Sequence, residues 1–153
     1  MPRPMTRPER EAFLAEPRVA VLSVAGGDGR SPLASPCFFA YEPGGHITFF
    51  TNTQRRNAAK VERIRHEGRV SVTVQRPQPP YMYVTVEGAV VSADRSPTAD
   101  EILAIAGRYM PEEHAWALAA SELEDPESTF VLFRVRPDRW LTADFSEEPT
   151  GSG

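Results

Sequence analysis

The chain has 153 residues, of which 41% are hydrophobic and 25% are charged, with a formal net charge of −4 at pH 7. These values are typical of one globular domain, and the acidic balance argues against general nucleic-acid affinity. No apolar run approaches the ~20 residues of a membrane span, and the polar N-terminus does not resemble a secretory signal. Since Cys37 is the only cysteine, we expect no internal disulfide and a cytoplasmic location.

The hydrophobic pattern predicts a mainly β protein with a few helices. Period-two alternation between Gly- and Pro-rich turns indicates strands, and three- to four-residue spacing after capping residues indicates helices. In chain order we expect a helix at 6–14, strands at 18–25, 33–41 and 47–51, a helix at 53–67, strands at 69–75 and 81–93, helices at 99–108 and 112–121, and a strand at 129–135. Six strands in meander order predict a small, closed or nearly closed antiparallel β-barrel. It forms a single domain over 1–146, and we expect the Pro/Gly/Ser-rich tail 147–153 to be disordered.

Positive charge is concentrated in one segment. Residues 53–76 contain seven basic and two acidic side chains, a net charge of +5, whereas the rest of the chain carries −9. Sixteen of the seventeen basic residues are arginine, which is typical of a GC-rich, actinobacterial kind of genome, and Lys60 is the only lysine. A lysine that persists in such a composition indicates a need for a compact ammonium group.

The helix expected at 53–67 begins with the wrong charge for its dipole. Its first two turns carry Arg55, Arg56 and Lys60, with no acid before Glu62. Because a helix N-terminus favours negative charge, this arrangement predicts a bound phosphate there, with donors from Thr51 and Asn52 at the preceding strand end. The alternative is a solvated basic face that pairs with the acidic remainder of the chain.

Five sequence pieces, taken in order, point to a known family. They are 36–41 (PCFFAY), 47–51 (ITFFT), 60–72 (KVERIRHEGRVSV), 79–88 (PPYMYVTVEG) and 136–141 (RPDRWL). Their order and spacing resemble the pyridoxamine 5′-phosphate oxidase-like superfamily, whose members are split β-barrels that bind FMN or the deazaflavin coenzyme F-420. The resemblance implies a six-stranded antiparallel split β-barrel and a homodimer with two cofactors, each at the subunit interface.

The resemblance also implies roles for particular residues. Lys60, Arg56 and Arg55 would hold the cofactor phosphate, and Thr51 and Asn52 would contact the phosphate or the ribityl chain. Further contacts are implied along the ring and from the partner subunit. The strand segment Pro36, Cys37 and Phe38 and the strand end at Gln75 would line the ring, while Trp140 would arrive from the partner.

The implied function is an oxidoreductase that transfers hydride between a flavin-type cofactor and a small organic substrate. The cofactor supplies the chemistry in such enzymes, so no catalytic residue and no metal site are predicted. The basic segment slightly favours coenzyme F-420 over FMN, because the deazaflavin carries a longer anionic tail. One alternative is a non-catalytic flavin or heme carrier, for which His46 or His66 would be the axial ligand. A binder of single-stranded nucleic acid ranks last, since its aromatic and basic residues would have to share one face.

Overall fold

The computed structural model of the chain describes residues 1–53, 56–124 and 130–146. Seven strands form one antiparallel sheet. They are β1 (Ala20–Val24), β2 (Leu33–Cys37), β3 (Phe39–Tyr41), β4 (Ile47–Asn52), β5 (Arg69–Arg76), β6 (Met82–Asp94) and β7 (Phe130–Asp144). The helices are α1 (Arg7–Ala15), α2 (Arg56–Glu67), α3 (Ala99–Ala106) and α4 (Glu112–Glu124). The expected tail at 147–153 lies outside the described residues.

The sheet curls into a barrel that is left open at one place. Its strand order is β2-β1-β5-β6-β7-β4-β3, so the two edge strands, β2 and β3, are consecutive in the chain and separated only by Phe38. The segment pairs with β1 before Phe38 and with β4 after it. This change of partner divides the strand expected at 33–41 into two, which is why the barrel has seven strands and not the predicted six. The mainly β, split-barrel class is confirmed.

The predicted meander order is wrong at two places. Strands β5, β6 and β7 follow one another as a meander, but β1 pairs with β5 and β4 pairs with β7. Sequence proximity favours neighbouring strands, whereas here α2 carries the chain across the barrel between β4 and β5. Both long-range pairings bury alternating apolar residues, such as Leu22 against Val72 and Phe49 against Phe133.

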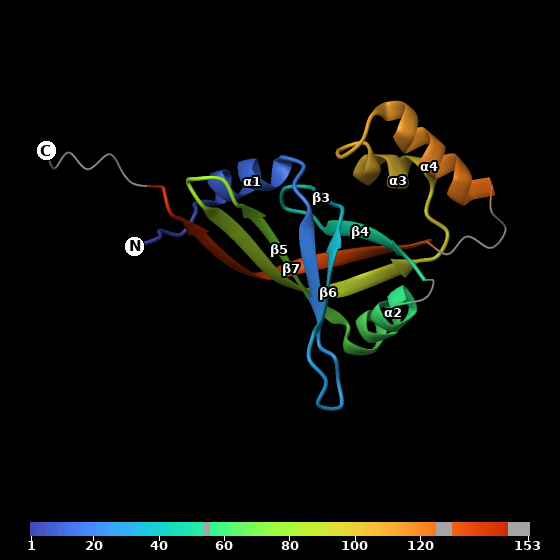
Figure 1. Cartoon of the computed structure of the whole chain (residues 1–153), viewed down its shortest axis with the longest axis horizontal. Coiled ribbons are helices and arrows are strands. Elements are labelled where there is room, and N and C mark those ends of the chain that lie inside the picture. Colours follow the sequence, from blue (N-terminus) through green and yellow to red (C-terminus); the bar gives the residue numbers. More distant parts are fainter. Residues whose placement is uncertain (54–55, 125–129, 147–153) are drawn as a thin grey trace, which may run out of the picture.

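Two helices close the barrel interior on opposite sides. In Figure 1, α1 lies on one side of the sheet and α2 on the other. Phe13 and Leu14 of α1 and Val61 and Ile64 of α2 are all buried in the same apolar cluster as the inward-facing strand residues. The apolar spacing that predicted α2 is therefore the spacing that packs it against the core, and it leaves the basic side chains on other faces.

Local signals in the sequence explain where several elements begin and end. Thr6 and Glu9 form a capping box at the start of α1, and Thr98 and Glu101 form a second one at the start of α3. Gly68 ends α2 with φ of +68°, a conformation that favours glycine, and its amide donates to the carbonyl of Ile64.

The hairpin of α3 and α4 covers the outer side of the sheet mainly at β3 and β4. Helix α3 lies against β3 and β4, and Arg134 of β7 forms an ion pair with Glu101 of α3. The buried residues of the α3–α4 hairpin lie outside the apolar cluster of the barrel and include Ile102, Ile105, Ala115 and Ala119. The hairpin therefore has an apolar layer of its own. None of the described helices is long and apolar enough to cross a membrane.

Gly88 is the position where the β6–β7 pairing tolerates no side chain. A Cβ there would lie 2.5 Å from the carbonyl oxygen of Arg136 and 2.6 Å from Cγ1 of Val135, next to a register shift. We expect Gly88→Ala to lower the free energy of unfolding by about 1–3 kcal/mol, the usual cost of overpacking, as measured by urea unfolding. Gly29→Asn is the control, because that turn has open space and Asn tolerates a positive φ. Equal stability of Gly88→Ala and Gly29→Asn would mean that the β6–β7 pairing can accommodate a side chain at position 88.

Candidate functional site

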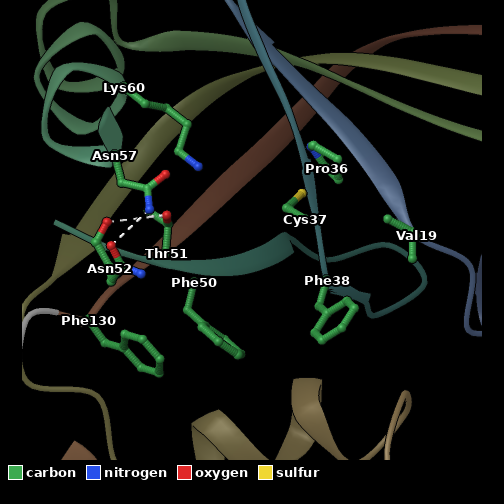
Figure 2. A pocket seen from close by; sticks show the side chains of 10 residues that line it. All are labelled: Val19, Pro36, Cys37, Phe38, Phe50, Thr51, Asn52, Asn57, Lys60 and Phe130. Atoms are coloured by element: carbon green, nitrogen blue, oxygen red, sulfur yellow. Dashed lines mark hydrogen bonds between the residues drawn. The ribbon is translucent and has the colours of Figure 1, made fainter. Parts of the chain in front are cut away.

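A cavity of about 300 Å³ lies where the barrel is split. One wall is the end of β2 with Phe38, and the other is the end of β4 with the first turns of α2, since β2 and β4 are not hydrogen-bonded to each other. Figure 2 shows the ten lining side chains. They are Val19, Pro36, Cys37, Phe38, Phe50, Thr51, Asn52, Asn57, Lys60 and Phe130.

Lys60 supplies the only charge among these lining residues. It is 8% exposed, and its Nζ donates to the hydroxyl of Ser35 on β2 over 3.0 Å. Among the residues that the structure describes, no carboxylate forms an ion pair with it, and burial lowers its pKa. A buried ammonium group without a counter-charge is costly. The geometry thus leaves a cation at the cavity wall that an anionic ligand would neutralise.

Polar side chains next to Lys60 form an ordered corner of the cavity. The Asn57 side-chain amide donates to Oδ1 of Asn52 over 2.8 Å, and the hydroxyl of buried Thr51 donates to the carbonyl oxygen of Asn52 over 3.3 Å (Figure 2). Asn57 precedes Lys60 by three residues, so the two share one side of α2. This corner combines a hydroxyl, two amides and an ammonium group, which is a donor set that suits a phosphate.

Cys37 faces the same cavity as a neutral thiol. Burial raises its pKa to about 12, and the positive charge of Lys60 opposes that shift only in part. A thiol with this pKa is a poor nucleophile near neutral pH, because the thiolate is the reactive form. Its place in the cavity therefore fits a packing contact with a ligand.

Six of the ten predicted site residues line this one cavity. They are Pro36, Cys37, Phe38, Thr51, Asn52 and Lys60. Arg55 lies outside the described residues, and Arg56 begins α2 without a described side chain. Gln75 is exposed and accepts from the hydroxyl of Tyr81, away from the cavity walls.

Trp140 lies against its own chain. Its ring contacts Tyr41 edge-on at 5.6 Å, and the guanidinium of Arg10 sits 3.9 Å from the ring centroid. Trp140 is paired with Val86, whose side chain is buried inside the barrel, so both face inward. The structure places it next to α1, and its predicted contact with a partner's cofactor stays a prediction.

Four lining residues were not among the predicted site residues. Asn57 and Phe50 neighbour predicted positions and could have been found from helical and strand spacing. Val19 and Phe130 carry no such signal. Phe130 reaches the cavity because β7 pairs with β4, which sets it opposite Asn52, and that pairing spans the whole of α2 to α4.

Part of the basic segment has other partners. Arg63 pairs with Glu67, and Arg69 forms a two-pronged ion pair with Asp138. Neither histidine proposed as a heme ligand, His46 or His66, lines the cavity. In the described ranges no cluster of His, Cys, Asp and Glu could hold a metal ion.

Comparison with known proteins agrees with this architecture. The family model for pyridoxamine 5′-phosphate oxidase matches residues 6–144. A solved structure named F420 reductase is 25% identical over 86% of this chain and 94% of its own, with a TM-score of 0.66.

Two further structures share the fold, at lower identity. An FAD-binding protein from Mesorhizobium loti is 23% identical over 94% of this chain and 98% of its own, with a TM-score of 0.61. A conserved hypothetical protein from Mycobacterium tuberculosis is 18% identical over 97% and 94%, with a TM-score of 0.70. No curated protein sequence matches significantly. The family match spans both walls of the cavity and every strand of the barrel, and on that basis the chain belongs to the pyridoxamine 5′-phosphate oxidase family.

Proposed function

We propose that the protein is an oxidoreductase that binds a flavin-type cofactor in the cavity and passes hydride between that cofactor and a small organic substrate. The observation that carries this proposal is Lys60, a buried ammonium group without a carboxylate partner among the described residues. A cofactor phosphate would supply the missing charge. Thr51, Asn52 and Asn57 would complete its binding site.

The remaining walls suit the rest of such a cofactor. Pro36 and Cys37 present apolar surface beside the polar corner, as a planar ring system requires. The volume is at the lower end of the range for small-molecule sites, roughly 300–1,000 Å³. One subunit would therefore enclose part of the cofactor, and a second subunit would cover the remainder. The bound cofactor supplies the hydride chemistry, while this chain binds its phosphate and orients its ring.

Coenzyme F-420 is the favoured cofactor, and FMN is its competitor. The similarity to a protein named F420 reductase, at 25% identity, supports the deazaflavin. The basic segment supports it less than its composition suggested, since Arg63 and Arg69 are engaged in ion pairs. A non-catalytic carrier on the same barrel would bind the cofactor equally well but would not turn it over. A heme carrier loses support because His46 and His66 lie away from the cavity.

We also propose a homodimer formed through the uncovered outer face of the sheet. One row of side chains crosses five strands on this face, and the pairing register sets its members opposite one another. The row is Pro36, Val21, Thr73, Thr85 and Leu141. Val21 and Leu141 are 40% and 42% exposed. Because the row ends at Pro36, a partner on this face would border the cavity.

The Lys60 assignment predicts opposite effects on binding and on stability. Lys60→Met keeps the apolar stem but removes the charge, so we expect cofactor binding to weaken by about 1.5–3 kcal/mol, the scale of a hydrogen bond to a charged group. The same change should raise the unfolding temperature of the cofactor-free protein, since it removes a buried charge. Fluorescence titration with FMN and with coenzyme F-420 and a thermal melt give both values.

Arg65→Met is the matched control, because Arg65 is an exposed cation on the same helix. Arg65→Met should change neither the cofactor affinity nor the unfolding temperature appreciably. Unchanged affinity in Lys60→Met would remove Lys60 from the phosphate site.

Cys37 reports on occupancy of the cavity because it is the only cysteine. With its pKa near 12, the alkylation rate should rise about tenfold per pH unit between about pH 7 and pH 10, without a plateau. A saturating cofactor should slow alkylation strongly at fixed pH, since its ring would cover the thiol. Mass spectrometry of the iodoacetamide adduct measures both effects. Equal rates with and without a tightly bound cofactor would place the ring elsewhere.

The proposed dimer face can be tested by one added charge. Leu141→Glu should shift the protein toward a monomer in sedimentation velocity and weaken cofactor binding, because a buried unpaired carboxylate is costly at an interface. Leu123→Glu on α4, where the leucine is 54% exposed, should leave the assembly state unchanged. A dimer that tolerates Leu141→Glu would mean that another face is used.

A further inference from the structure

The cavity has a second end whose chemistry differs from that of the phosphate corner. Phe38, Phe50 and Phe130 line it, and Figure 2 shows their rings on one side of the cavity with Lys60 on the other. Phe50 and Phe130 contact each other, with ring centroids 5.0 Å apart. Among the residues that the structure describes, no charged side chain lines this end. It offers half-buried aromatic surface, which suits an uncharged ligand.

Phe38 is held in place by a residue outside the barrel. Its ring stacks on Tyr109, with centroids 4.2 Å apart and an interplanar angle of 11°. Phe38 lies in the break between β2 and β3, where sheet hydrogen bonds do not hold the backbone. The stack with Tyr109 therefore restrains the Phe38 ring, and the opposite face of that ring lines the cavity.

Tyr109 is itself fixed at the strand break. Its hydroxyl donates to the carbonyl oxygen of Arg18 over 2.8 Å and accepts from the amide of Phe39 over 3.2 Å. The neighbouring Arg108 donates to the carbonyl oxygens of Phe39 and Leu14. The turn that follows α3 is thus fastened to β3 and to the end of α1. Through this turn, the α3–α4 hairpin determines the position of one cavity wall.

We propose that the aromatic end is the substrate site, that it takes a planar, uncharged, apolar aromatic compound, and that Tyr109 is the positioning residue that sets its wall through Phe38. This inference rests on the proposed function, in which the phosphate corner and the apolar segment beside it hold the cofactor. A substrate at the aromatic end would then lie next to the cofactor ring. Its lack of charge follows from walls that offer no counter-charge.

The test uses a matched pair of probes on the cofactor-saturated protein. We expect 2-naphthol, which is neutral near pH 7, to bind, and naphthalene-2-sulfonate, which has the same ring system and a negative charge, to bind at least about tenfold more weakly. Ligand-observed NMR titration measures both dissociation constants. Equal affinity for the two probes would overturn the assignment of substrate class.

Variants of Tyr109 separate positioning from folding. Tyr109→Leu removes the stack, so 2-naphthol should bind about three- to tenfold more weakly, the range expected for an aromatic pair. Tyr109→Phe keeps the ring and loses the hydroxyl contacts, so its affinity should stay within about twofold of the wild type even where a melt shows lower stability. Trp116→Leu, on the same hairpin and 49% exposed, should have no effect. If Tyr109→Leu does not fold, Phe38→Leu serves instead, with the same expected loss.

Cofactor titration of the same proteins distinguishes the two proposals. Tyr109→Leu with normal cofactor affinity and weakened 2-naphthol binding supports the inference. Wild-type affinity for 2-naphthol in both Tyr109→Leu and Phe38→Leu would overturn it while leaving the cofactor assignment intact. If the wild type binds neither cofactor, the proposed function fails. Titration of the cofactor-free protein with 2-naphthol then tests the aromatic end by itself, which stands if Tyr109→Leu or Phe38→Leu weakens this binding and falls if neither does.

Discussion

The change of hydrogen-bonding partner at Phe38 is the constraint on which the site depends. Residues 33–37 pair with β1 and residues 39–41 pair with β4, so one continuous segment joins both edges of the sheet. Two strands that diverge from a common segment leave space between them, and the cavity occupies that space. Helix α2 then brings Lys60 to the opening from the other side. A fully closed barrel would have filled this volume with paired backbone and core side chains.

Lys60 shows how stability and function oppose each other in this protein. The helix that carries it is anchored by Val61 and Ile64 in the core, which forces the neighbouring ammonium group into a poorly solvated position. One hydroxyl contact, from Ser35, does not offset the loss of water. In the proposed function, the cofactor phosphate would offset this cost. Lys60 differs in this respect from seven arginines of the described part of the chain, which form ion pairs with acidic side chains.

The barrel and the helical hairpin divide the proposed recognition between them. The barrel and α2 supply the phosphate corner, whereas the turn after α3 positions the aromatic wall through Tyr109 and Phe38. The hairpin has its own apolar layer and contacts the barrel at few places. Changes within the hairpin can therefore alter the wall without disturbing the phosphate corner. In the proposed function, this arrangement would allow one cofactor site to serve different substrates.

Much of this protein is readable from the sequence alone. Short-range signals predicted the strands, the capped helices, the end of α2 at Gly68 and the cavity residues 51–52 and 60, because each depends on neighbours within a few positions. The cavity residues 36–38 followed from the family resemblance. The tertiary structure decided the rest. Pairing of β4 with β7 brought Phe130 to the site, the inward phase of β7 set Trp140 against Tyr41 and Arg10, and contacts between residues 70 positions apart joined Tyr109 to the strand break. These facts depend on which strands meet and in which register, and that is set by burial of the whole core rather than by any local pattern.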